Sequence, residues 1–538
     1  MPPYPTDIPV VIVGAGPTGL TTANLLAVYG VDCIVLEANK APMNLPRAIV
    51  IDDEGMRAMQ TFGLDKTYLK DTMPGVGSRY YDDAGNCFAE TGQGPRNFGF
   101  AKRQFIYQPE LESALETHLA RKRPGTLHFS SEVEDVQNAQ DHAIVRLRDM
   151  NGQTHQIRTQ WVLACDGGRS PIREGLGIAM SGNTYEEDWI VVDTINDPDK
   201  TLYSKFFCSG LRPTVSVPAP HNGRRYEFML LPGETREEVL KDAFLETLIA
   251  PYRPYRTPDI LRKTVYRFHA RMAEQFQSGR VVLMGDAAHL TPPFAGQGMN
   301  AGLRDAHNVA WKLAAIIAGD ADPSVMLSYE KERRKPAWDM IQLAVAMGSI
   351  VMPAGRDQIL FRDLLLQALD PFPAVKDYLV HMRFKPKPRY EGGLFIDLED
   401  PQFDASLVGE MIPQPRVRQG DLIQLLDDAL GPGFSLIAQC KAGADALAAL
   451  AQTSLLGLPL CKVTLNSLGG TLSNDDWTPI DQQTTRPFLT HRDQILLVRP
   501  DRYCAAAFSP DTLADVLGQF TAQLRQRDKS KSATAIPA

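Results

Sequence analysis

A glycine-rich turn between an apolar segment and a helical segment constrains the start of this chain most strongly. Residues 8–13 (IPVVIV) are apolar and predict a buried strand. Gly14, Gly16 and Gly19 follow, and residues 20–29 then have the pattern of a helix. In such a unit the first glycine permits a tight turn, the second lets the backbone approach a pyrophosphate, and the third lets the helix pack on the strand. The positive end of the helix would face the phosphates.

A second apolar segment supports the same prediction. Residues 32–36 predict another strand, which ends at Glu37. A carboxylate about 20 residues after the glycine turn is suited to accept hydrogen bonds from ribose hydroxyls. A glycine turn alone is also compatible with a plain loop, but strand, turn, helix, strand and acidic residue in this order predict a dinucleotide site. The motif does not distinguish NAD from FAD.

Length, charge and cysteine content exclude several classes of protein. A chain of 538 residues predicts two or three domains, and a net charge of −8 argues against a nucleic-acid partner. The seven cysteines form neither a CxxC pair nor a cluster with metal-ligand spacing. We therefore expect no metal site and a reduced, cytoplasmic protein. No segment has the pattern of a signal peptide or a membrane span, so we expect no membrane association.

Two later strand-to-turn motifs contain aspartate. Residues 161–165 predict a strand that ends in Asp166 and Gly167, which alone could be a simple change of chain direction. Residues 280–284 predict another strand, followed by Gly285 and Asp286. A predicted helix over 301–318 begins just after Gly298, Met299 and Asn300. An aspartate after a strand can bind ribose or ribityl hydroxyls, while the backbone N–H groups of a helix start can stabilise negative charge on a reduced flavin.

The three motifs, in this order, resemble the class A FAD-dependent aromatic hydroxylases, over essentially the whole chain. The branch that contains 3-(3-hydroxyphenyl)propionate hydroxylase is the most similar. The segments that carry this similarity are 46–48, 51–54, 190–193, Phe228 with 232–234, and 382–386, and the helix residues of the family signature are Asp305, Asn308, Trp311 and Lys312. The chain departs from the common form at Ala295, usually glycine, and at Arg304, usually glutamine.

The resemblance implies an α/β fold with a Rossmann-like FAD-binding domain. We expect its first part over 1–175, an inserted mixed β-sheet substrate domain over 176–270, and its second part with long helices over 271–352. A connector over 353–391 would lead to a thioredoxin-like domain over 392–538. Because that domain lacks CxxC, it would have a structural or dimer-stabilising role rather than dithiol exchange, in a homodimer.

The resemblance also implies a reaction in aromatic catabolism. NAD(P)H would reduce FAD, O₂ would add at the flavin C4a carbon, and the resulting hydroperoxide would hydroxylate a phenolic ring in a water-excluding pocket. No dedicated nicotinamide domain is expected, so no residue distinguishes NADH from NADPH. The implied cofactor-binding residues are Gly14, Gly16, Gly19, Glu37, Arg47, Gln108, Asp166, Gly285, Asp286, Pro293, Gly298, Met299 and Asn300. Arg47 could instead be a surface arginine, and Gln108 a helix-start residue.

The sequence identifies the residues that would contact the phenol less clearly than those that would bind the cofactor. A phenolic acid needs a cation for its carboxylate, and Arg212 or Arg225 could supply it unless both are solvated. Relatives often carry His or Asp just after residues 46–48, where this chain has Ile49. The proton acceptor would then be Asp52, Tyr107, Tyr226, His269 or a water chain, although His269 could be structural. Thus Asp52, His269, Tyr226 and Pro293 are the catalytic candidates, and Arg212, Arg225 and Tyr107 the substrate-binding ones.

Other functions remain to be compared with this one. The substrate could be another phenol, of the hydroxybenzoate, resorcinol or alkylphenol type. A disulfide reductase would need a redox cysteine pair and a second glycine-rich turn, and a flavin halogenase a tryptophan-rich segment, none of which occurs. A non-catalytic flavin-binding sensor remains the alternative from the class of binding proteins.

Overall fold

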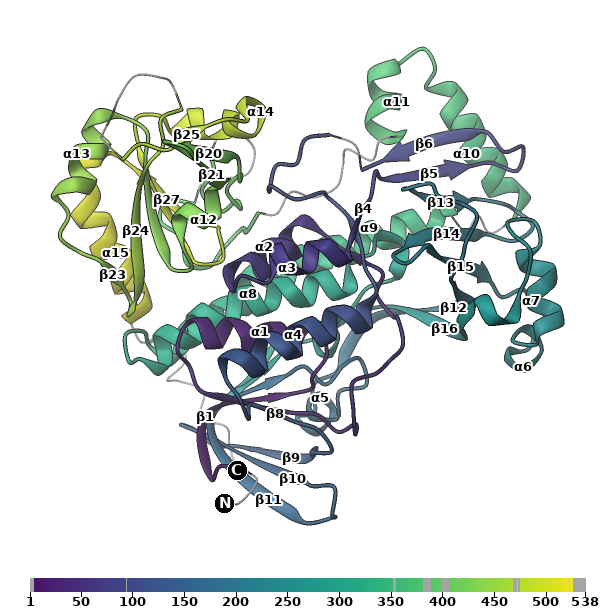
Figure 1. Cartoon of the computed structure of the whole chain (residues 1–538), viewed down its shortest axis with the longest axis horizontal. Helices are drawn as coiled ribbons and strands as arrows, with labels where there is room; N and C mark the ends of the chain where they lie inside the picture. Colours follow the sequence, from purple (N-terminus) through teal and green to yellow (C-terminus); the bar gives the residue numbers. More distant parts are fainter. Residues whose placement is uncertain are drawn as a thin grey trace.

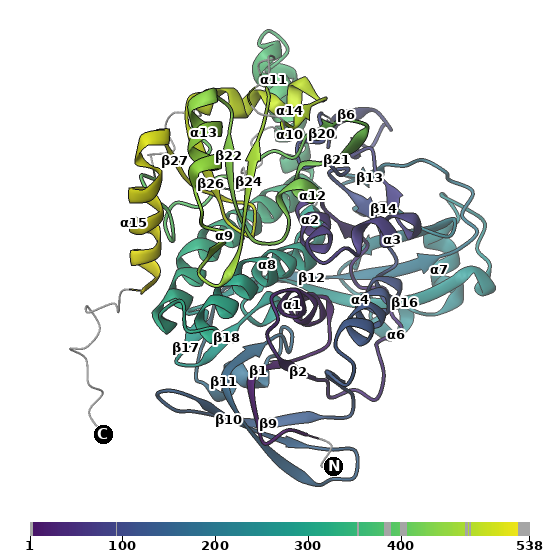
Figure 2. The ribbon, with the colours of Figure 1, turned by 60° about the vertical axis from the view of Figure 1, so that its left-hand side comes forward.

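The computed structural model describes residues 4–92, 94–351, 355–380, 389–398, 406–467, 472 and 475–525. The similarity segment 382–386 and part of the expected connector therefore lie outside the described residues. Figures 1 and 2 show two sheets joined by long helices, with a C-terminal unit packed against the helices.

The first sheet contains the strands that precede all three predicted motifs. It has eight strands: β1 (Asp7–Val13), β2 (Cys33–Leu36), β8 (Leu127–His128), β9 (Glu132–Asn138), β10 (Ala143–Arg148), β11 (Thr154–Ala164), β17 (Gln277–Ser278) and β18 (Val281–Leu283). β1 pairs in parallel with β2 and β11, and β11 pairs in parallel with β18. Since parallel strands end at the same edge of a sheet, the turns after β1, β11 and β18 meet there.

Long helices lie over this sheet, and the last of them also packs against the second sheet. They are α1 (Pro17–Val28), α4 (Gln108–Lys122), α8 (Gly298–Ile317) and α9 (Leu327–Val351). Shorter helices near the same edge are α2 (Asp53–Thr61), α3 (Asp65–Tyr68) and α5 (Pro171–Gly175). A Cβ atom at Gly302 would lie 2.1 Å from Oγ1 of Thr18, so α8 can approach α1 only with glycine there. α8 begins at Gly298, three residues before the predicted start, and its first turn is thereby part of the motif itself.

The second sheet, also of eight strands, lies across from the motif edge (Figure 1). Its strands are β5 (Ser78–Tyr81), β6 (Cys87–Thr91), β12 (Met180–Thr194), β13 (Ser204–Phe207), β14 (Thr214–Ala219), β15 (Gly223–Met229), β16 (Ile260–Ala273) and β19 (His289–Leu290). The sheet expected within 176–270 therefore also recruits strands from both parts of the expected FAD-binding domain. Helices α6 (Arg236–Val239) and α7 (Asp242–Ile249) pack on the face away from the motifs.

A small three-stranded sheet lies between the two large ones. It consists of β3 (Val50–Ile51), β4 (Met73–Pro74) and β7 (Gln104–Phe105), in the order β3-β7-β4. Helices α10 (Arg356–Ala368) and α11 (Pro373–Val380) lie beside β5 and β6 at the far end of the second sheet (Figure 1).

The C-terminal unit has its own sheet. Its strands are β22 (Phe434–Ala438), β23 (Ser454–Leu455), β24 (Leu458–Thr464), β26 (Ile495–Val498) and β27 (Cys504–Phe508), with α13 (Lys441–Ala449) and α15 (Leu513–Arg525). Smaller elements are β20 (Arg416–Gln419), β21 (Leu422–Leu425), β25 (Thr478–Pro479), α12 (Leu426–Leu430) and α14 (Gln482–Thr485). β22 and β24 are parallel, whereas β26 is antiparallel to both β22 and β27.

A buried charge network joins this unit to the helices. Arg499 donates to Glu332 of α9 at 2.7 Å, and Lys312 of α8 donates to the same carboxylate at 2.8 Å. Arg499 also pairs with Asp501. Burial alone would raise the pKa of Glu332, but the neighbouring cations Arg499 and Lys312 outweigh it and hold that pKa well below its usual range. Loss of any one of these buried charges would leave its partner uncompensated, so the network holds the C-terminal unit against the helices.

Candidate functional site

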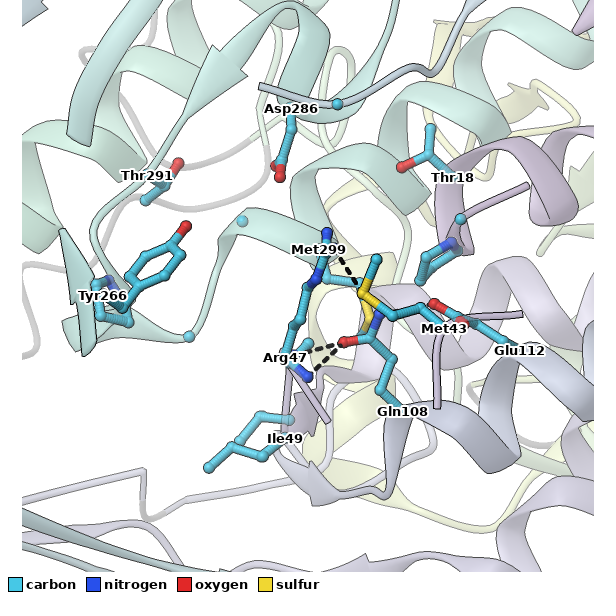
Figure 3. A pocket seen from close by; sticks show the side chains of 18 of the residues that line it. Thr18, Met43, Arg47, Ile49, Gln108, Glu112, Tyr266, Asp286, Thr291 and Met299 are labelled. Carbon is cyan, nitrogen blue, oxygen red and sulfur yellow. Dashed lines mark hydrogen bonds between the residues drawn. The ribbon is translucent and has the colours of Figure 1, made fainter. Parts of the chain in front are cut away.

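A pocket of about 550 Å³ lies where the three motif turns meet the second sheet. Its lining combines the turn after β1, the loop over residues 41–50, the turn after β11, the near face of the second sheet and residues 284–299. Its size is that of a typical small-molecule site. Figure 3 shows Arg47, Gln108 and Met43 on one side of it, with Asp286, Thr291 and Tyr266 on the other.

The turn after β1 is so tightly packed that two of its three predicted glycines leave no room for a side chain. Gly14 has φ +104°, and a Cβ atom there would lie 2.3 Å from the carbonyl oxygen of Cys165. A Cβ atom at Gly19 would lie 2.0 Å from the carbonyl oxygen of Gly14. Gly16, in contrast, has no atom within 4 Å of its Cβ position and opens on the pocket. The turn is thus packed behind and open in front, where α1 presents its N-terminus, which fits a pyrophosphate.

Glu37 is oriented at the end of β2 by backbone donors. Its Oε2 accepts from the N–H of Ala15 at 2.9 Å, and its Oε1 accepts from the N–H of Asn39 at 2.9 Å. The side chain lines the pocket beside the glycine turn. This position fits the predicted contact with ribose hydroxyls.

The loop that contains Arg47 is held from two sides. Oε1 of Gln108 accepts from the N–H groups of Arg47 at 3.1 Å and Ala48 at 2.6 Å. From the second sheet, Arg225 donates to the carbonyl oxygens of Arg47 at 2.6 Å and Pro46 at 2.5 Å. Arg47 lines the pocket, and its guanidinium lies 2.7 Å from Sδ of Met43 (Figure 3), while the side chain as a whole is exposed. The backbone of the loop is therefore held in place, whereas its cation stays in contact with solvent.

Asp166 and Asp286 face the pocket from the two later turns. Oδ2 of Asp166 accepts from Ser170 Oγ at 2.8 Å, whereas its buried Oδ1 has no partner among the described residues. Burial raises the pKa of both carboxyls. Arg173 donates to the carbonyl oxygens of Gly168 and Ala287, at 3.1 and 3.3 Å, and so ties the two turns together. The free Oδ1 fits a hydroxyl donor on a bound ligand.

The start of α8 completes this side of the pocket. Gly298 and Met299 line it, as does Pro293 in the preceding loop. Asn300 does not line it: its side chain accepts from the N–H of Asp52 at 3.0 Å and donates to the carbonyl oxygen of Gly296 at 2.9 Å. The free N–H groups of the first helical turn are therefore positioned next to the pocket.

Two of the predicted cofactor-binding residues, Gly285 and Gly19, shape the turns around the pocket but do not line it. Gly285 has φ +58°, and its N–H donates to Asp305 at 2.9 Å. Asp305 also accepts from His289 at 2.7 Å and from Arg333 at 2.8 Å. The turn that presents Asp286 is thus fixed from behind by α8 and α9.

The near face of the second sheet is apolar with a few charged groups. Its lining residues include Val191, Phe206, Val215, Val217 and Phe268 together with Arg225, Glu227 and Arg262. Glu227 is buried, and burial raises the pKa of its carboxyl. His269 also lines the pocket; its Nδ1 lies 3.0 Å from Oγ1 of Thr184, and partial burial lowers its pKa.

Two residues predicted to contact the phenol, Tyr226 and Arg212, do not line this pocket. Tyr226 follows Arg225 on β15, and successive side chains of a strand face opposite sides of the sheet. Tyr226 therefore packs in the cluster under α7 and donates to Asp197 at 3.0 Å. Arg212 does not line the pocket either: it donates to Glu234 at 3.0 Å and to the carbonyl oxygen of Met229 at 2.7 Å.

Three further candidates have structural partners. Asp52 caps α2 by accepting from the N–H of Gly55 at 2.9 Å, and it pairs with Arg304. Tyr107 precedes α4 with its ring edge-on to His221, and like Asp52 it does not line the pocket. Arg225 lines the pocket, but Asp193 at 2.6 Å and the loop carbonyls occupy its donors. Among the residues predicted to contact the phenol, His269 and Pro293 also line the pocket, and neither forms an ion pair within the described part of the chain.

Sequence reasoning missed Glu227 and Arg103, which both line the pocket. The period of a strand could have found Glu227, because it lies two residues after Arg225 and faces the same side. Arg103 precedes the two-residue strand β7, and no local pattern marks it.

Some classes of site are absent from the part of the chain that is described. No group of three or more His, Cys, Asp or Glu side chains there could hold a metal ion. No helix among the same residues is long and apolar enough to span a membrane. All seven cysteines are described, and each is a free thiol.

Comparison with known proteins places the chain among flavin enzymes. Residues 7–344 match a family described as FAD binding domain, and residues 409–523 match one described as HcaD C-terminal domain. The chain is 38% identical to a 3-(3-hydroxy-phenyl)propionate/3-hydroxycinnamic acid hydroxylase from Burkholderia vietnamiensis, over 95% of this chain and 96% of that one. A hydroxylase of the same name from Shigella sonnei is 36% identical over 96% and 94% of the two chains.

Solved structures show the same fold. Aklavinone-11 hydroxylase in complex with FAD and aklavinone has a TM-score of 0.77 and 21% identity, over 96% of this chain and all of that one (100%). The p-nitrophenol 4-monooxygenase from Pseudomonas putida has a TM-score of 0.63 and 26% identity, over 71% of this chain and 98% of that one.

Proposed function

Because the chain belongs to the FAD-dependent aromatic hydroxylases, we propose that it hydroxylates a phenolic acid of the 3-(3-hydroxyphenyl)propionate type, using NAD(P)H and O₂. The observation that carries this proposal is the pocket in which the three motif turns face an apolar sheet containing a few cations. The names of the two hydroxylases that share more than a third of their residues with this chain support the choice of substrate.

The pocket residues fit FAD. Gly14, Gly16 and the start of α1 would hold the pyrophosphate, and Glu37 the ribose. Asp286, with the free Oδ1 of Asp166, would bind hydroxyl groups of the cofactor. The N–H groups at Gly298 and Met299 would face the flavin ring. When bound, FAD supplies the hydride acceptance and oxygen activation that no amino-acid side chain provides.

The chain's own residues would orient the phenol and move its proton. Valine and phenylalanine side chains of the second sheet exclude water from the ring. His269 is the proposed proton acceptor, since it lines the pocket and partial burial lowers its pKa, which favours the neutral imidazole that can accept a proton. Thr184 would fix the orientation of the imidazole through Nδ1, leaving Nε2 for the phenol.

Four finer points belong to the same proposal. NAD(P)H is the reductant expected for a hydroxylase of this class. A thioredoxin-like C-terminal domain is supported by the parallel pair β22 and β24 joined through α13 and followed by the antiparallel strands β26 and β27 and helix α15. A homodimer and a cytoplasmic location, in keeping with the free cysteines, complete it.

The test is a substrate panel with purified protein. We expect a yellow protein with bound FAD that oxidises NADH or NADPH faster when 3-(3-hydroxyphenyl)propionate is present, and a product with one added hydroxyl group. Hydroxybenzoates, resorcinols and alkylphenols in the panel identify a different phenol as the substrate if one of them gives the larger kcat/KM. Binding of FAD without accelerated oxidation by any phenol would contradict the proposal and favour a flavin-binding sensor.

A further inference from the structure

Arg103 lines the pocket near the loop that leads into α8. It directly precedes β7. Its Nη1 donates to Ser78 Oγ of β5 at 2.7 Å. A Cβ atom at Gly296, in the loop before α8, would lie 3.4 Å from its Nη2. The guanidinium therefore lies between the second sheet and the loop that faces the flavin position.

The charge of Arg103 is not balanced by a carboxylate. Asp193 pairs with both Arg225, at 2.6 Å, and Arg262, at 3.8 Å. Arg47 lies on the cofactor side of the pocket, near Met43 (Figure 3). Among the described residues Arg103 forms no ion pair. Burial lowers its pKa, while Tyr80 and Asp52 act in the opposite direction, and Asp52 itself is paired with Arg304. The Arg103 side chain is only partly buried beside the pocket, so a negatively charged ligand there would reach it and balance its charge.

Ser204 provides a second, neutral donor next to Arg103. In the parallel pairing of β13 with β5, Ser204 lies opposite Ser78, which accepts from Arg103. Ser204 is only 1% exposed, it lines the pocket, and its Oγ has no hydrogen-bond partner among the described residues. A buried hydroxyl without a partner costs free energy, and a bound acceptor would remove that cost.

We propose that Arg103 and Ser204 form the subsite that binds the carboxylate of the phenolic acid. A guanidinium can grip a carboxylate with two parallel N–H groups, and the hydroxyl of Ser204 can donate to the same group. Phe206 and Val215 line the pocket on neighbouring strands and would cover the alkyl chain that joins carboxylate and ring. The subsite rests on the proposed function, and it would take the role for which the sequence suggested Arg212 or Arg225.

The experiment compares an acid with a neutral substrate of matched length. 3-(3-Hydroxyphenyl)propionate and its alcohol, 3-(3-hydroxyphenyl)propan-1-ol, differ only in the group that would meet Arg103. For Arg103→Gln, we expect Kd and KM of the acid to rise about 100-fold, as for the loss of one partner of a buried charge pair. For Ser204→Ala, we expect a rise of about 5-fold, as for one hydrogen bond. Values for the alcohol should change by less than about 3-fold in both variants, because the alcohol has no ion pair with Arg103 to lose and its neutral hydroxyl forms a weaker hydrogen bond with Ser204 than a carboxylate does.

Two further variants make the result specific. Arg103→Lys keeps the charge but loses the planar two-donor grip, so it should recover part of the affinity for the acid. Arg212→Gln is the matched control outside the pocket and should leave Kd for both compounds unchanged. Turnover of the alcohol by Arg103→Gln shows that the variant is folded and holds FAD.

The outcomes separate the subsite from the function. If Arg103→Gln binds the acid as tightly as the unchanged protein does, or loses affinity for acid and alcohol equally, the subsite is overturned while the hydroxylase function stands. If the unchanged protein hydroxylates neither compound nor any other phenol, the proposed function itself fails. A selective loss of affinity for the acid supports both.

Discussion

Arg304 compensates the negative charge of two carboxylates beside the pocket. It pairs with Asp52 and, at 2.8 Å, with Glu54. Burial would lower the pKa of Arg304, but the two carboxylates outweigh it and hold that pKa well above its usual value. The glutamine common in the family would satisfy neither negative charge. One cation thus keeps the start of α2 next to α8.

Replacing this cation should destabilise the protein. Arg304→Gln removes the cation that pairs with the buried carboxylates of Asp52 and Glu54, so we expect a loss of about 3 kcal/mol in the free energy of unfolding. Denaturant titration with the tryptophan signal measures it. Adding Asp52→Asn and Glu54→Gln to Arg304→Gln should recover most of the loss. No recovery would show that the charges are not the cause.

The glycine turn gives a second prediction for single residues. Gly16→Ala has space for its methyl group but places it where a pyrophosphate would lie. We expect Gly16→Ala to fold with unchanged stability while its Kd for FAD, measured by flavin fluorescence, rises at least 10-fold, or about 1.4 kcal/mol. Gly175→Ala, which also has open space around its Cβ position, is the control. Equal FAD affinity in both variants would contradict the assignment of this turn.

At the scale of elements, α8 connects the pocket to the rest of the molecule. Its first turn faces the pocket, Asp305 in its second turn holds the N–H of Gly285, and Lys312 reaches Glu332 of α9. Burial would raise the pKa of Asp305, but His289 and Arg333 outweigh it and hold that pKa far below its usual range. The orientation of the flavin turn therefore depends on an ion pair behind it.

This dependence predicts an effect on FAD without a contact to it. Asp305→Asn keeps the size of the side chain but weakens its bonds to His289 and Arg333. We expect FAD affinity to fall about 10-fold, in the range found for residues that orient the ligands of a site. Equilibrium dialysis against FAD measures it. Unchanged affinity would show that Gly285 holds its conformation without Asp305.

Elements defined by local sequence could be predicted, and those defined by distant pairing could not. β1, α1 and β2 appear where the apolar segments and glycines placed them, because turn chemistry and hydrophobic period act over neighbouring residues. The addition of β5 and β6 to the second sheet depends on pairing between β5 and β13 across more than a hundred residues of sequence. Arg103 and Ser204 come together through that same pairing, so no local motif marks their subsite.

On the scale of the whole molecule, one buried carboxylate links the C-terminal unit to α8 and α9, beside further contacts such as the Arg57–Asp427 pair. Glu332 accepts from both Arg499 and Lys312 and is fully buried. Its pKa and that of Asp305 are lowered by folding. For a lowered pKa, the contribution to stability is present above the unfolded value, about 4 for these carboxyls, and is lost as the pH falls toward the folded value.

Acid should therefore loosen the contact between the C-terminal unit and the helices. We expect the free energy of unfolding to be steady near neutral pH and to decrease as the pH falls below about 4. Glu332→Gln should cost about 3 kcal/mol at pH 7 and make the decrease shallower. Urea titrations between neutral and acidic pH measure both effects. The same slope in both proteins would rule out Glu332 as a source of the pH dependence.

The proposed hydroxylase function needs the pocket residues, α8 and both sheets, because together they would enclose a phenol beside FAD. Its most direct test is to turn over 3-(3-hydroxyphenyl)propionate under oxygen gas labelled with the heavy isotope and to analyse the product by mass spectrometry. Our account predicts a hydroxylated product that contains one labelled oxygen atom and forms together with NAD(P)H oxidation. A product without the label, or NAD(P)H oxidation that yields only hydrogen peroxide with every phenol, would contradict it.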